Sequence, residues 1–532
     1  MASSYKTSAR EGKMQGRGRL FNPGAALSSR GAEAAVAELN VRRPGTTRYP
    51  IDLKAFAKLK VQSKKAAKLA KPESTVATDK ARSKQELASR AGGGAAMLEA
   101  APPAAAPSSA ANFAGIAATG WLPPDCTLAA GPQHLLASVN SSVAVYNKTG
   151  GAALIRKTLT AWFSNVIQQA TIFDPKALYD QHAARWVLAA VAVAQNPDRS
   201  WFLLSVSKTS DPAGAWTNYA LDATKDGTTA TRNWADYPAL GVDSKALYLT
   251  ANMFRFDGDF QYAKLRIIPK QAVYAGGTIT FKDIVRLKNA DGSMAFTVQP
   301  CHTYGAPQVQ YLVNSYYPTS ANPTQNKLSL WSLTNPLVTP ALSRSTITTS
   351  AYGLAPDAAQ QGGGTPIDSG DIRILNAVFR GGSVWAGLTT RHRFGSGSNV
   401  AAIHWFQINP TSGALVQQGI YGANARHYFN PAVMPDNNGN MVLGFSRCGT
   451  TEFCSIHFTG RKASDPLGQL QSSALLKTGT ANYLGLDSGG RNRWGDYAGI
   501  TSDPAAGRVV WFYNEYATAG NKWATWIGSA FF

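Results

Sequence analysis

The sequence contains the pattern Trp-x-Asp-Tyr twice, in two segments separated by about half of its length. It occurs in "TRNWADYPAL", residues 231–240, and in "RNRWGDYAGI", residues 491–500. Each copy continues into a strand of small residues, a turn and a second strand that ends in Asn252 or Asn514. The shared unit is therefore a β-hairpin, and a hairpin that recurs indicates a repeat architecture.

Looser copies of this hairpin recur along the chain at spacings of roughly 50 to 70 residues. They begin at Asp125, Phe173, His302, Asp371 and His427. Four strands per unit at this spacing, with small residues on the first strand, predict an all-β β-propeller of seven four-stranded blades. The two ends of the chain are expected to complete one blade together. A pair of two-sheet sandwiches is the alternative, but it would not produce seven related hairpins.

Composition divides the chain into three parts. Residues 1–92 contain 20 Lys and Arg against 7 Asp and Glu and no Trp, whereas the remainder contains 32 against 24 and all 13 Trp. The first part is predicted to be a basic arm that is disordered or ordered by a partner. Residues 93–120 are rich in Ala, Pro and Gly, which is typical of a linker. Residues 121–532 are predicted to form the propeller.

The charge of the arm indicates polyanionic partners, such as an acidic protein, a cell wall or a virion interior. Nucleic acid is compatible with the charge, but no nucleic-acid motif supports it, and a solvated tail without a partner is the simpler alternative. The longest apolar run, Val187 to Ala194, is shorter than the roughly 18 residues that a transmembrane helix needs. The N-terminus lacks the apolar region of a secretory signal peptide, and a transit peptide is the weaker alternative for it.

Several segments together carry a family resemblance. They are "PPDCTLAAGPQHLLASVNSSVAVYNKTG", "SVSKTSDPAGAW" and "RWGDYAGITSDPAAGRVVWFYNEY". Over residues 121–532 the chain resembles a family of mostly bacterial, usually secreted β-propeller proteins of the sialidase-like superfamily, whose activities are largely uncharacterised. The spacing Thr209-x-Asp211-x4-Trp216 resembles an Asp-box, also called a BNR motif, which is a structural turn without a catalytic role. The resemblance implies an extracellular, cell-surface or virion-associated protein, although no signal peptide is seen.

The aligned hairpins place carboxylates at one mouth of the propeller channel. The five are Asp125, Asp174, Asp236, Asp371 and Asp496, and His302 and His427 take the same place in the other two units. Converging carboxylates repel one another unless a cation is present, and a shell of oxygen ligands suits Ca²⁺. Ca²⁺ is therefore the one cofactor to consider. The alternative is that each Asp accepts hydrogen bonds from its own turn or from the next blade.

Arginines accompany these carboxylates. Three of them, Arg232, Arg373 and Arg493, could together hold the carboxylate of a ligand, as sialidases hold sialic acid. With Asp236 and Asp496 beside them, a sialidase-like glycoside hydrolase or lyase is chemically feasible. Such a site also needs a Tyr and Glu pair, and neither Glu452 nor Glu515 is an obvious partner for a Tyr. Arg–Asp ion pairs between neighbouring blades are the alternative explanation.

Aromatic and His side chains of the hairpins are candidate ligand contacts: Trp234, Tyr237, His302, His427, Trp494 and Tyr497. They could stack on sugar rings if exposed, or act as packing wedges between blades if buried. The first hypothesis for function is thus a non-enzymatic recognition or structural protein that binds a glycan or protein partner, and the glycosidase is the second.

Two cysteines lie close together in "SRCGTTEFCS". Cys448 and Cys454 could form a disulfide, which would imply an oxidising compartment. The equally weighted alternative is a pair of buried thiols on neighbouring strands.

Overall fold

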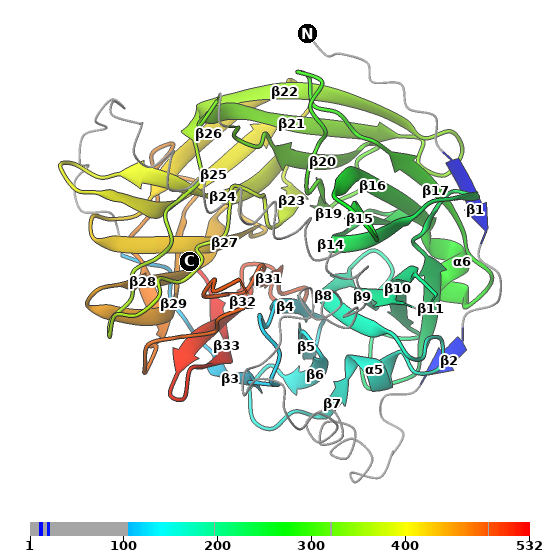
Figure 1. Ribbon diagram of the computed structural model, residues 1–532, viewed down its shortest axis with the longest axis horizontal. Helices are drawn as coiled ribbons and strands as arrows, with labels where there is room; N and C mark the ends of the chain where they lie inside the picture. Colours follow the sequence, from blue (N-terminus) through cyan, green and yellow to red (C-terminus); the bar gives the residue numbers. More distant parts are fainter. Residues whose placement is uncertain (1–9, 14–18, 22–104, 196, 320–321, 488) are drawn as a thin grey trace.

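The chain folds as an all-β β-propeller, in which sheets stand side by side around a central axis (Figure 1). The computed structural model describes residues 10–13, 19–21, 105–195, 197–319, 322–487 and 489–532. Apolar runs such as "RWVLAAVAVA" (185–194) are buried along nearly their whole length, because an inner strand is covered on both faces by the neighbouring sheets. In the described part of the chain, no helix is both long and apolar enough to cross a membrane.

Five sheets are separate blades, each named here by its first inner strand. The β4 blade contains β4 (Thr127–Ala130), β5 (His134–Val139), β6 (Ser142–Asn147) and β7 (Ile155–Thr158). The β8 blade contains β8 (Thr171–Asp180), β9 (Arg185–Ala194), β10 (Arg199–Ser207), β11 (Trp216–Asp222) and β2 (Arg19–Phe21). The β18 blade contains β18 (Gln299–Pro300), β20 (Gln310–Ser315), β21 (Gln325–Thr334) and β22 (Ala341–Tyr352). The β27 blade contains β27 (Arg426–Pro435), β28 (Met441–Gly449), β29 (Glu452–Arg461) and β30 (Ala474–Lys477). The β31 blade contains β31 (Gly499–Ser502), β32 (Val510–Thr518), β33 (Lys522–Ala530) and β3 (Asn112–Ala117).

The remaining long strands form one ten-stranded sheet. Its first antiparallel run is β14 (Asn233–Val242), β15 (Ala246–Arg255), β16 (Phe260–Pro269) and β17 (Thr280–Val285), extended by β1 (Arg10–Lys13). Its second run is β23 (Ala377–Arg380), β24 (Ser383–Arg393), β25 (Asn399–Asn409) and β26 (Ala414–Tyr421). The strand β19 (His302–Thr303) joins the two runs. A two-stranded ribbon, β12 (Lys225–Asp226) and β13 (Thr229–Ala230), and two short helices, α5 (Leu159–Trp162) and α6 (Lys270–Ala275), complete the described elements.

The expectation of seven separate blades is wrong, since five are separate and the other strands are merged. The merger comes from β19, which pairs in parallel with β14 through Val242 and with β23 through Val378 and Phe379. The innermost strand of the β18 blade is only two residues long, so the residues that follow it are free to bridge the strands on either side.

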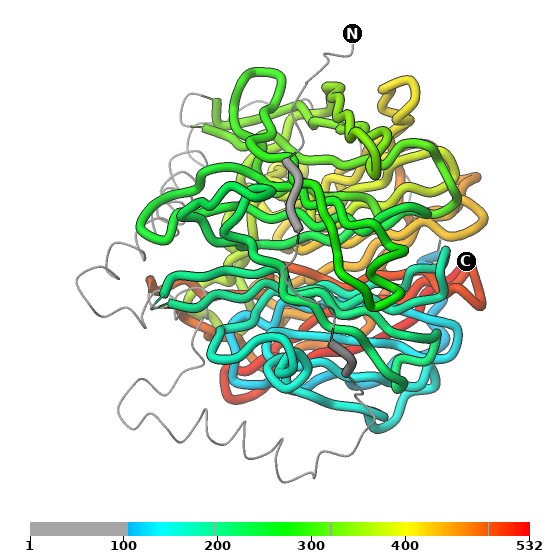
Figure 2. Tube along the Cα trace, turned by 90° about the vertical axis from the view of Figure 1, so that its right-hand side faces the viewer, coloured from blue at the N-terminus to red at the C-terminus, as the bar shows by residue number. Residues whose placement is uncertain are grey.

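The two ends of the propeller share the β31 blade, as expected. β3 pairs antiparallel with β33, next to the C-terminus, and light-blue and red segments accordingly lie close together in the side view (Figure 2). Residues 112–117 were predicted to be linker, and this boundary is wrong, because the apolar Phe113 and Ile116 continue the last sheet. Two short pieces of the basic arm, β1 and β2, lie as outermost strands, and the rest of residues 1–92 lies outside the described residues.

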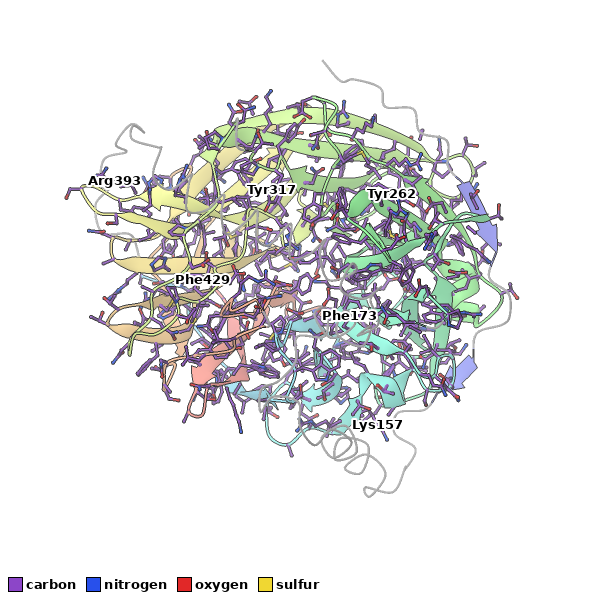
Figure 3. The ribbon with its side chains drawn as sticks, in the orientation of Figure 1. Lys157, Phe173, Tyr262, Tyr317, Arg393 and Phe429 are labelled. Atoms are coloured by element: carbon purple, nitrogen blue, oxygen red, sulfur yellow. The ribbon has the colours of Figure 1, made fainter. Side chains whose placement is uncertain are left out.

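Three innermost strands carry the same irregularity. Asp174, Tyr237 and Asn430 have φ values of 51°, 54° and 53°, and each is followed by a proline. At all three places two residues of the inner strand stand opposite one residue of the second strand, which defines a β-bulge. Proline is tolerated there because a bulge releases it from the hydrogen-bond ladder. In Figure 3, Phe173 and Phe429, the residues that precede two of these bulges, lie on the inner part of the ring.

Candidate functional site

The bulges and their equivalents join each unit to the next by hydrogen bonds around the axis. In four of these joints, a side-chain oxygen of one unit accepts from a backbone N–H of the next unit along the chain. The four are Asn140 Oδ1 from Asp174 N (2.7 Å), Ser200 Oγ from Ala235 N (3.0 Å), Asn252 Oδ1 from Thr297 N (2.8 Å) and Thr389 Oγ1 from Asn430 N (3.2 Å). Ser315 Oγ donates to Ile372 O (2.6 Å), and Ser446 Oγ accepts from Trp494 Nε1 (3.1 Å). The repeated short polar residues therefore act as joints between neighbouring units.

The last joint closes the ring. Asp496 N donates to Asp125 Oδ1 at 2.7 Å, and Asn140 Nδ2 donates to Asp125 Oδ2 at 2.6 Å. Asp125 is fully buried and has a φ of 55°. Both of its carboxylate oxygens thus accept hydrogen bonds, one from the end of the propeller and one from its own blade.

Two tyrosines, one from each Trp-x-Asp-Tyr motif, meet at the axis. The rings of Tyr237 and Tyr497 lie 4.5 Å apart between centroids. The Tyr237 hydroxyl donates to Asp496 O at 2.9 Å, and the Tyr497 hydroxyl donates to Asp174 Oδ2 at 3.0 Å. Burial, followed by the charge of Asp174, raises the pKa of Tyr497 well above its usual value, so this hydroxyl stays protonated as a donor.

Three charged side chains surround the tyrosine pair and keep some exposure. Arg373 is held by Asp371, whose carboxylate accepts from Nε at 2.8 and 2.9 Å, and its guanidinium lies 4.3 Å from the centre of the Tyr237 ring. Lys176 Nζ lies 2.8 Å from the centre of the Tyr497 ring. Burial opposes the charge on Arg373, but Asp371 outweighs it and raises the pKa of the guanidinium. This group of Lys176, Arg373 and Asp496 around the two rings is called the axial mouth.

A buried carboxyl lies beneath the mouth. Glu515 is 0 % exposed, and its Oε1 accepts from Gly495 N at 2.6 Å. Burial raises the pKa of Glu515 well above its ordinary range, and the charges of Asp125 and Asp496 add to the increase. Sequence reasoning found no role for Glu515, although its place directly after the strand-ending Asn514 is the signal that links it to the motif.

The five predicted metal ligands are not gathered around one point in the described residues, and most of them have other partners. No group of three or more His, Cys, Asp or Glu among the described residues is placed to hold a metal. Asp125 and Asp174 accept hydrogen bonds of the ring joints, whereas Asp371 and Asp496 pair with nearby arginines. Hydrogen bonds and arginines therefore supply to four of these five carboxylates what a cation would have supplied, which favours the alternative of hydrogen-bonded turns and joints over a Ca²⁺ site.

The predicted arginine cluster is only partly assembled. Arg493 donates to Asp496 Oδ2 at 3.0 Å, so it belongs to the axial group with Arg373. Arg232 has a side chain 71 % exposed and pairs with Asp257 at 3.3 Å, away from the mouth. The closest Arg–Asp pairs of the mouth, Arg373–Asp371 and Arg493–Asp496, are local in sequence, whereas Arg491 and Asp368, at 3.8 Å, are a pair between two units of the kind that the alternative describes. Asp236 is buried on β14, in register with Asn252.

The two tryptophans of the motif are packing residues. Trp494 is 1 % exposed and lies edge-on to Tyr483 with 4.9 Å between centroids. Trp234 is also buried and packs against Phe173 and Phe254. Stacking on a sugar requires an exposed ring face, which neither indole offers, so the alternative of a buried wedge describes both.

The two predicted histidines lie apart from the mouth. His302 is in β19, beside the far end of β14 (Figure 1), where its Nε2 lies 2.9 Å from Gln181 Oε1. The residue that takes the equivalent place in the β18 blade is Thr297, which exchanges hydrogen bonds with Asn252. His427 is buried, and its Nδ1 accepts from Ala401 N at 3.2 Å.

The two close cysteines remain thiols. Cys448 and Cys454 are both free and buried on the neighbouring strands β28 and β29. The structure therefore agrees with the alternative of two buried thiols and not with a disulfide. Burial raises the pKa of the Cys454 thiol well above its usual value.

Comparison with known proteins gives no family. No family model matches the sequence, and no curated protein matches it. Among solved structures, a protein of unknown function from Dyadobacter fermentans has a TM-score of 0.38 at 10 % identity, covering 69 % of this chain and 96 % of that one. The GH93 α-L-arabinofuranosidase of Fusarium graminearum has a TM-score of 0.35 at 8 % identity (79 % and 98 %). Trypanosoma rangeli sialidase has a TM-score of 0.35 at 9 % identity (73 % and 57 %). Likeness at this level carries no argument about function, and the fold rests on the chain's own sheets.

Proposed function

We propose that this chain is a recognition protein whose propeller binds a glycan or protein partner at the axial mouth. The observation that carries the proposal is the use of the recurring Asp and Tyr side chains as joints: Asp125, Asp174, Tyr237 and Tyr497 all hydrogen-bond to other units of the ring. Side chains whose hydrogen bonds hold the ring closed are poorly suited to act as acids, bases or nucleophiles in a catalytic cycle. The chain would then resemble the secreted, sialidase-like propellers in fold while differing from a hydrolase in its centre.

The partner would carry a carboxylate. Arg373 donates to Asp371 from Nε, and among the described residues its Nη1 and Nη2 groups have no hydrogen-bond acceptor. Its side chain keeps 18 % exposure, so these N–H groups can meet a ligand. Guanidinium groups favour planar oxyanions, and Lys176 adds a second positive charge beside the same pair of rings.

Hydrolysis is less well supported by the same geometry. A glycosidase places two carboxyl groups on either side of the scissile bond. Here Glu515 is enclosed and bound to Gly495 N, and Asp496 pairs with Arg493. Neither carboxyl is presented to a substrate as a free acid or nucleophile, which supports binding over catalysis.

Titration with 3′-sialyllactose and with lactose, which lacks the carboxylate, tests the proposal. We expect the acidic sugar to bind at least about tenfold more tightly, since a charge-assisted hydrogen bond contributes about 1.5 to 3 kcal/mol. Arg373→Gln should remove this preference, whereas Arg393→Gln, on an exposed hairpin at the outer edge of the ring (Figure 3), should not. Release of free sialic acid by the wild type, abolished in Asp496→Asn at unchanged stability, would instead establish the hydrolase.

The basic arm completes the proposal as an anchor to a polyanionic surface. It rests on the 20 Lys and Arg against 7 Asp and Glu in residues 1–92. Binding of the full chain to a surface coated with polyglutamate should weaken sharply between low and high salt, because exposed charges are screened within about 10 Å at 0.1 M. Binding that does not respond to salt would contradict an electrostatic anchor.

A further inference from the structure

A second place on the propeller has the features of a ligand site. A pocket of about 380 Å³ lies where the second run of the ten-stranded sheet meets the β27 blade. It shares no residue with the axial mouth. The residues of its lining that matter for its chemistry are Arg380, Trp385, Val416, Gln417, Arg461 and Leu467.

Arg461, the last residue of β29, is the unusual member of this lining. It is 2 % exposed, yet the one hydrogen bond of its side chain among the described residues runs from Nη2 to Asp465 O at 2.6 Å. Its Nε is buried and has no hydrogen-bond partner there. Burial lowers the pKa of this guanidinium, and the charge of Asp465 only partly opposes that effect. A covered cation whose donors remain unused is costly unless an anion completes it.

Arg380 is held in a similar way from the other side of the pocket. Its Nη1 donates to Pro435 O at 2.8 Å and to Ser502 Oγ at 2.9 Å, and its Nη2 donates to Asn437 Oδ1. All of these acceptors are neutral. They fix the guanidinium in place, and its burial lowers its pKa, which Tyr304 and the charge of Asp436 only partly oppose.

The two acids nearest to these arginines are used by their own loops. Asp436 accepts from the backbone N–H groups of Asn438 and Asn440 and from the Asn440 amide. Asp465 accepts from Lys462 N at 2.8 Å and from Gln471 Nε2 at 2.9 Å. The pocket therefore presents two arginines and one carboxylate, that of Asp436, whose oxygens already accept three hydrogen bonds from its own turn.

The edge of the pocket is apolar. Leu467 is 68 % exposed and Val416 is 40 % exposed, and Trp385 supplies a covered aromatic surface behind them. Gln417 lies between the two kinds of surface, with its amide bound to Gln407 and Gly468. Oxyanion-binding donors inside and large exposed apolar side chains outside define a site for an amphipathic anion.

We propose that this pocket binds a carboxylate attached to a short apolar stem, with the carboxylate on Arg461 and the stem against Leu467 and Val416. Two sources can present this chemistry. One is a free short-chain carboxylic acid, and the other is a Glu side chain next to a Leu in a peptide of a partner protein.

Calorimetric titration of the full chain with hexanoate tests the site, with hexylamine as the matched cation. We expect hexanoate to bind with a stoichiometry of one and hexylamine not to bind. Arg461→Gln should weaken hexanoate at least about tenfold, because it removes charge-assisted hydrogen bonds. The control Lys462→Gln removes the same charge one residue further on, at an exposed position outside the pocket, and should leave the affinity within about twofold.

A second variant keeps the test decisive if Arg461→Gln fails to fold. Leu467→Glu changes an exposed residue and places a competing carboxylate at the edge of the pocket, so it should also weaken hexanoate. The peptide acetyl-Leu-Glu-Leu-amide, compared with its Gln counterpart, distinguishes the sources. Binding of the Glu peptide but not of hexanoate supports a protein partner, and binding of hexanoate alone supports a small acid. Binding of neither probe, or equal binding to both variants and the wild type, would overturn the proposal.

Discussion

Arg266 and Arg461 occupy comparable places, each towards the end of the third strand of a four-stranded antiparallel run, but their surroundings differ. Arg266 on β16 is fully buried and donates to both oxygens of Asp283, at 2.8 and 2.7 Å, and to two backbone carbonyls. Arg461 on β29 has a single carbonyl. A buried arginine whose N–H donors all have acceptors within the chain, here called matched, stabilises the fold. A buried arginine whose donors lack acceptors, here called unmatched, indicates a site for a ligand.

Removing the matched arginine should have the largest effect. Arg266→Met leaves Asp283 buried without its cation, which typically lowers the free energy of unfolding by about 3 to 5 kcal/mol. Urea unfolding of the variant measures this loss. The exposed Arg393→Met should change stability by less than about 0.5 kcal/mol. A loss from Arg266→Met no larger than that of the control would mean that the Arg266–Asp283 pair does not stabilise its sheet.

A ring joint should come next, because Asn140 is matched by its partners but carries no charge itself. Asn140→Ala removes hydrogen bonds to Pro123, Asp125 and Asp174, and the stranded groups should lower the free energy of unfolding by about 3 kcal/mol. Asn424, which is exposed, provides the control, and Asn424→Ala should be nearly neutral. Equal melting temperatures of the two variants would show that the joints do not carry the closure.

His404 is a buried base that, unlike Arg461, can lose its proton and so avoid the cost of a buried charge. His404 is fully buried, and its Nε2 lies 2.9 Å from Gln418 Oε1, an acceptor, so Nε2 carries the proton of the neutral ring. Burial lowers the pKa of His404 from 6.5 to about 4. The neutral ring therefore contributes stability above pH 6.5, which is lost as the pH falls towards 4.

The expected slope from this histidine is about 1.4 kcal/mol per pH unit in that window. His404→Gln should remove that part of the acid sensitivity, as seen by urea unfolding at pH 7, 6, 5 and 4. An unchanged slope would mean that His404 is already protonated in the folded chain.

The unmatched arginine should have the smallest effect on stability. Arg461→Met removes a charge with one hydrogen bond to a carbonyl and replaces it with an apolar chain of similar length. We expect the free energy of unfolding to stay within about 1 kcal/mol of the wild-type value, and a small increase in stability would agree with the account as well as a small decrease. A loss as large as that of Arg266→Met would show that Arg461 is matched inside the chain, and the contrast between the two would fail.

Much of the fold could be predicted because the repeat is written in local sequence. The Trp-x-Asp-Tyr motifs predict two hairpins and an axial meeting of their residues, and the rings of Tyr237 and Tyr497 do lie against each other there, tilted by 45°. The merger of two sheets through β19 could not be predicted, since it depends on a parallel pairing of Val242 with His302, residues that are distant in sequence.

The site was harder to predict than the fold, because the role of a side chain depends on what surrounds it. A row of Asp residues fits a metal site, a catalytic site or a set of joints equally well until their hydrogen-bond partners are known. Asn140 hydrogen-bonds to two of these residues, Asp125 and Asp174, and it belongs to a different hairpin from Asp174. Arg461 carries no signal in the sequence either, since its lack of a carboxylate partner becomes visible only when Asp436 and Asp465 are found to be bound in their own loops.

The central claim is that the axial carboxylates join the ring and bind no ion. Thermal unfolding of the full chain in EDTA, followed by addition of excess Ca²⁺, tests this most directly. We predict the same melting temperature within about one degree, because a ligand that does not bind the folded state cannot stabilise it. A Ca²⁺-dependent rise of several degrees, lost in Asp125→Asn, would contradict the account and show that the ring of aspartates is an ion site.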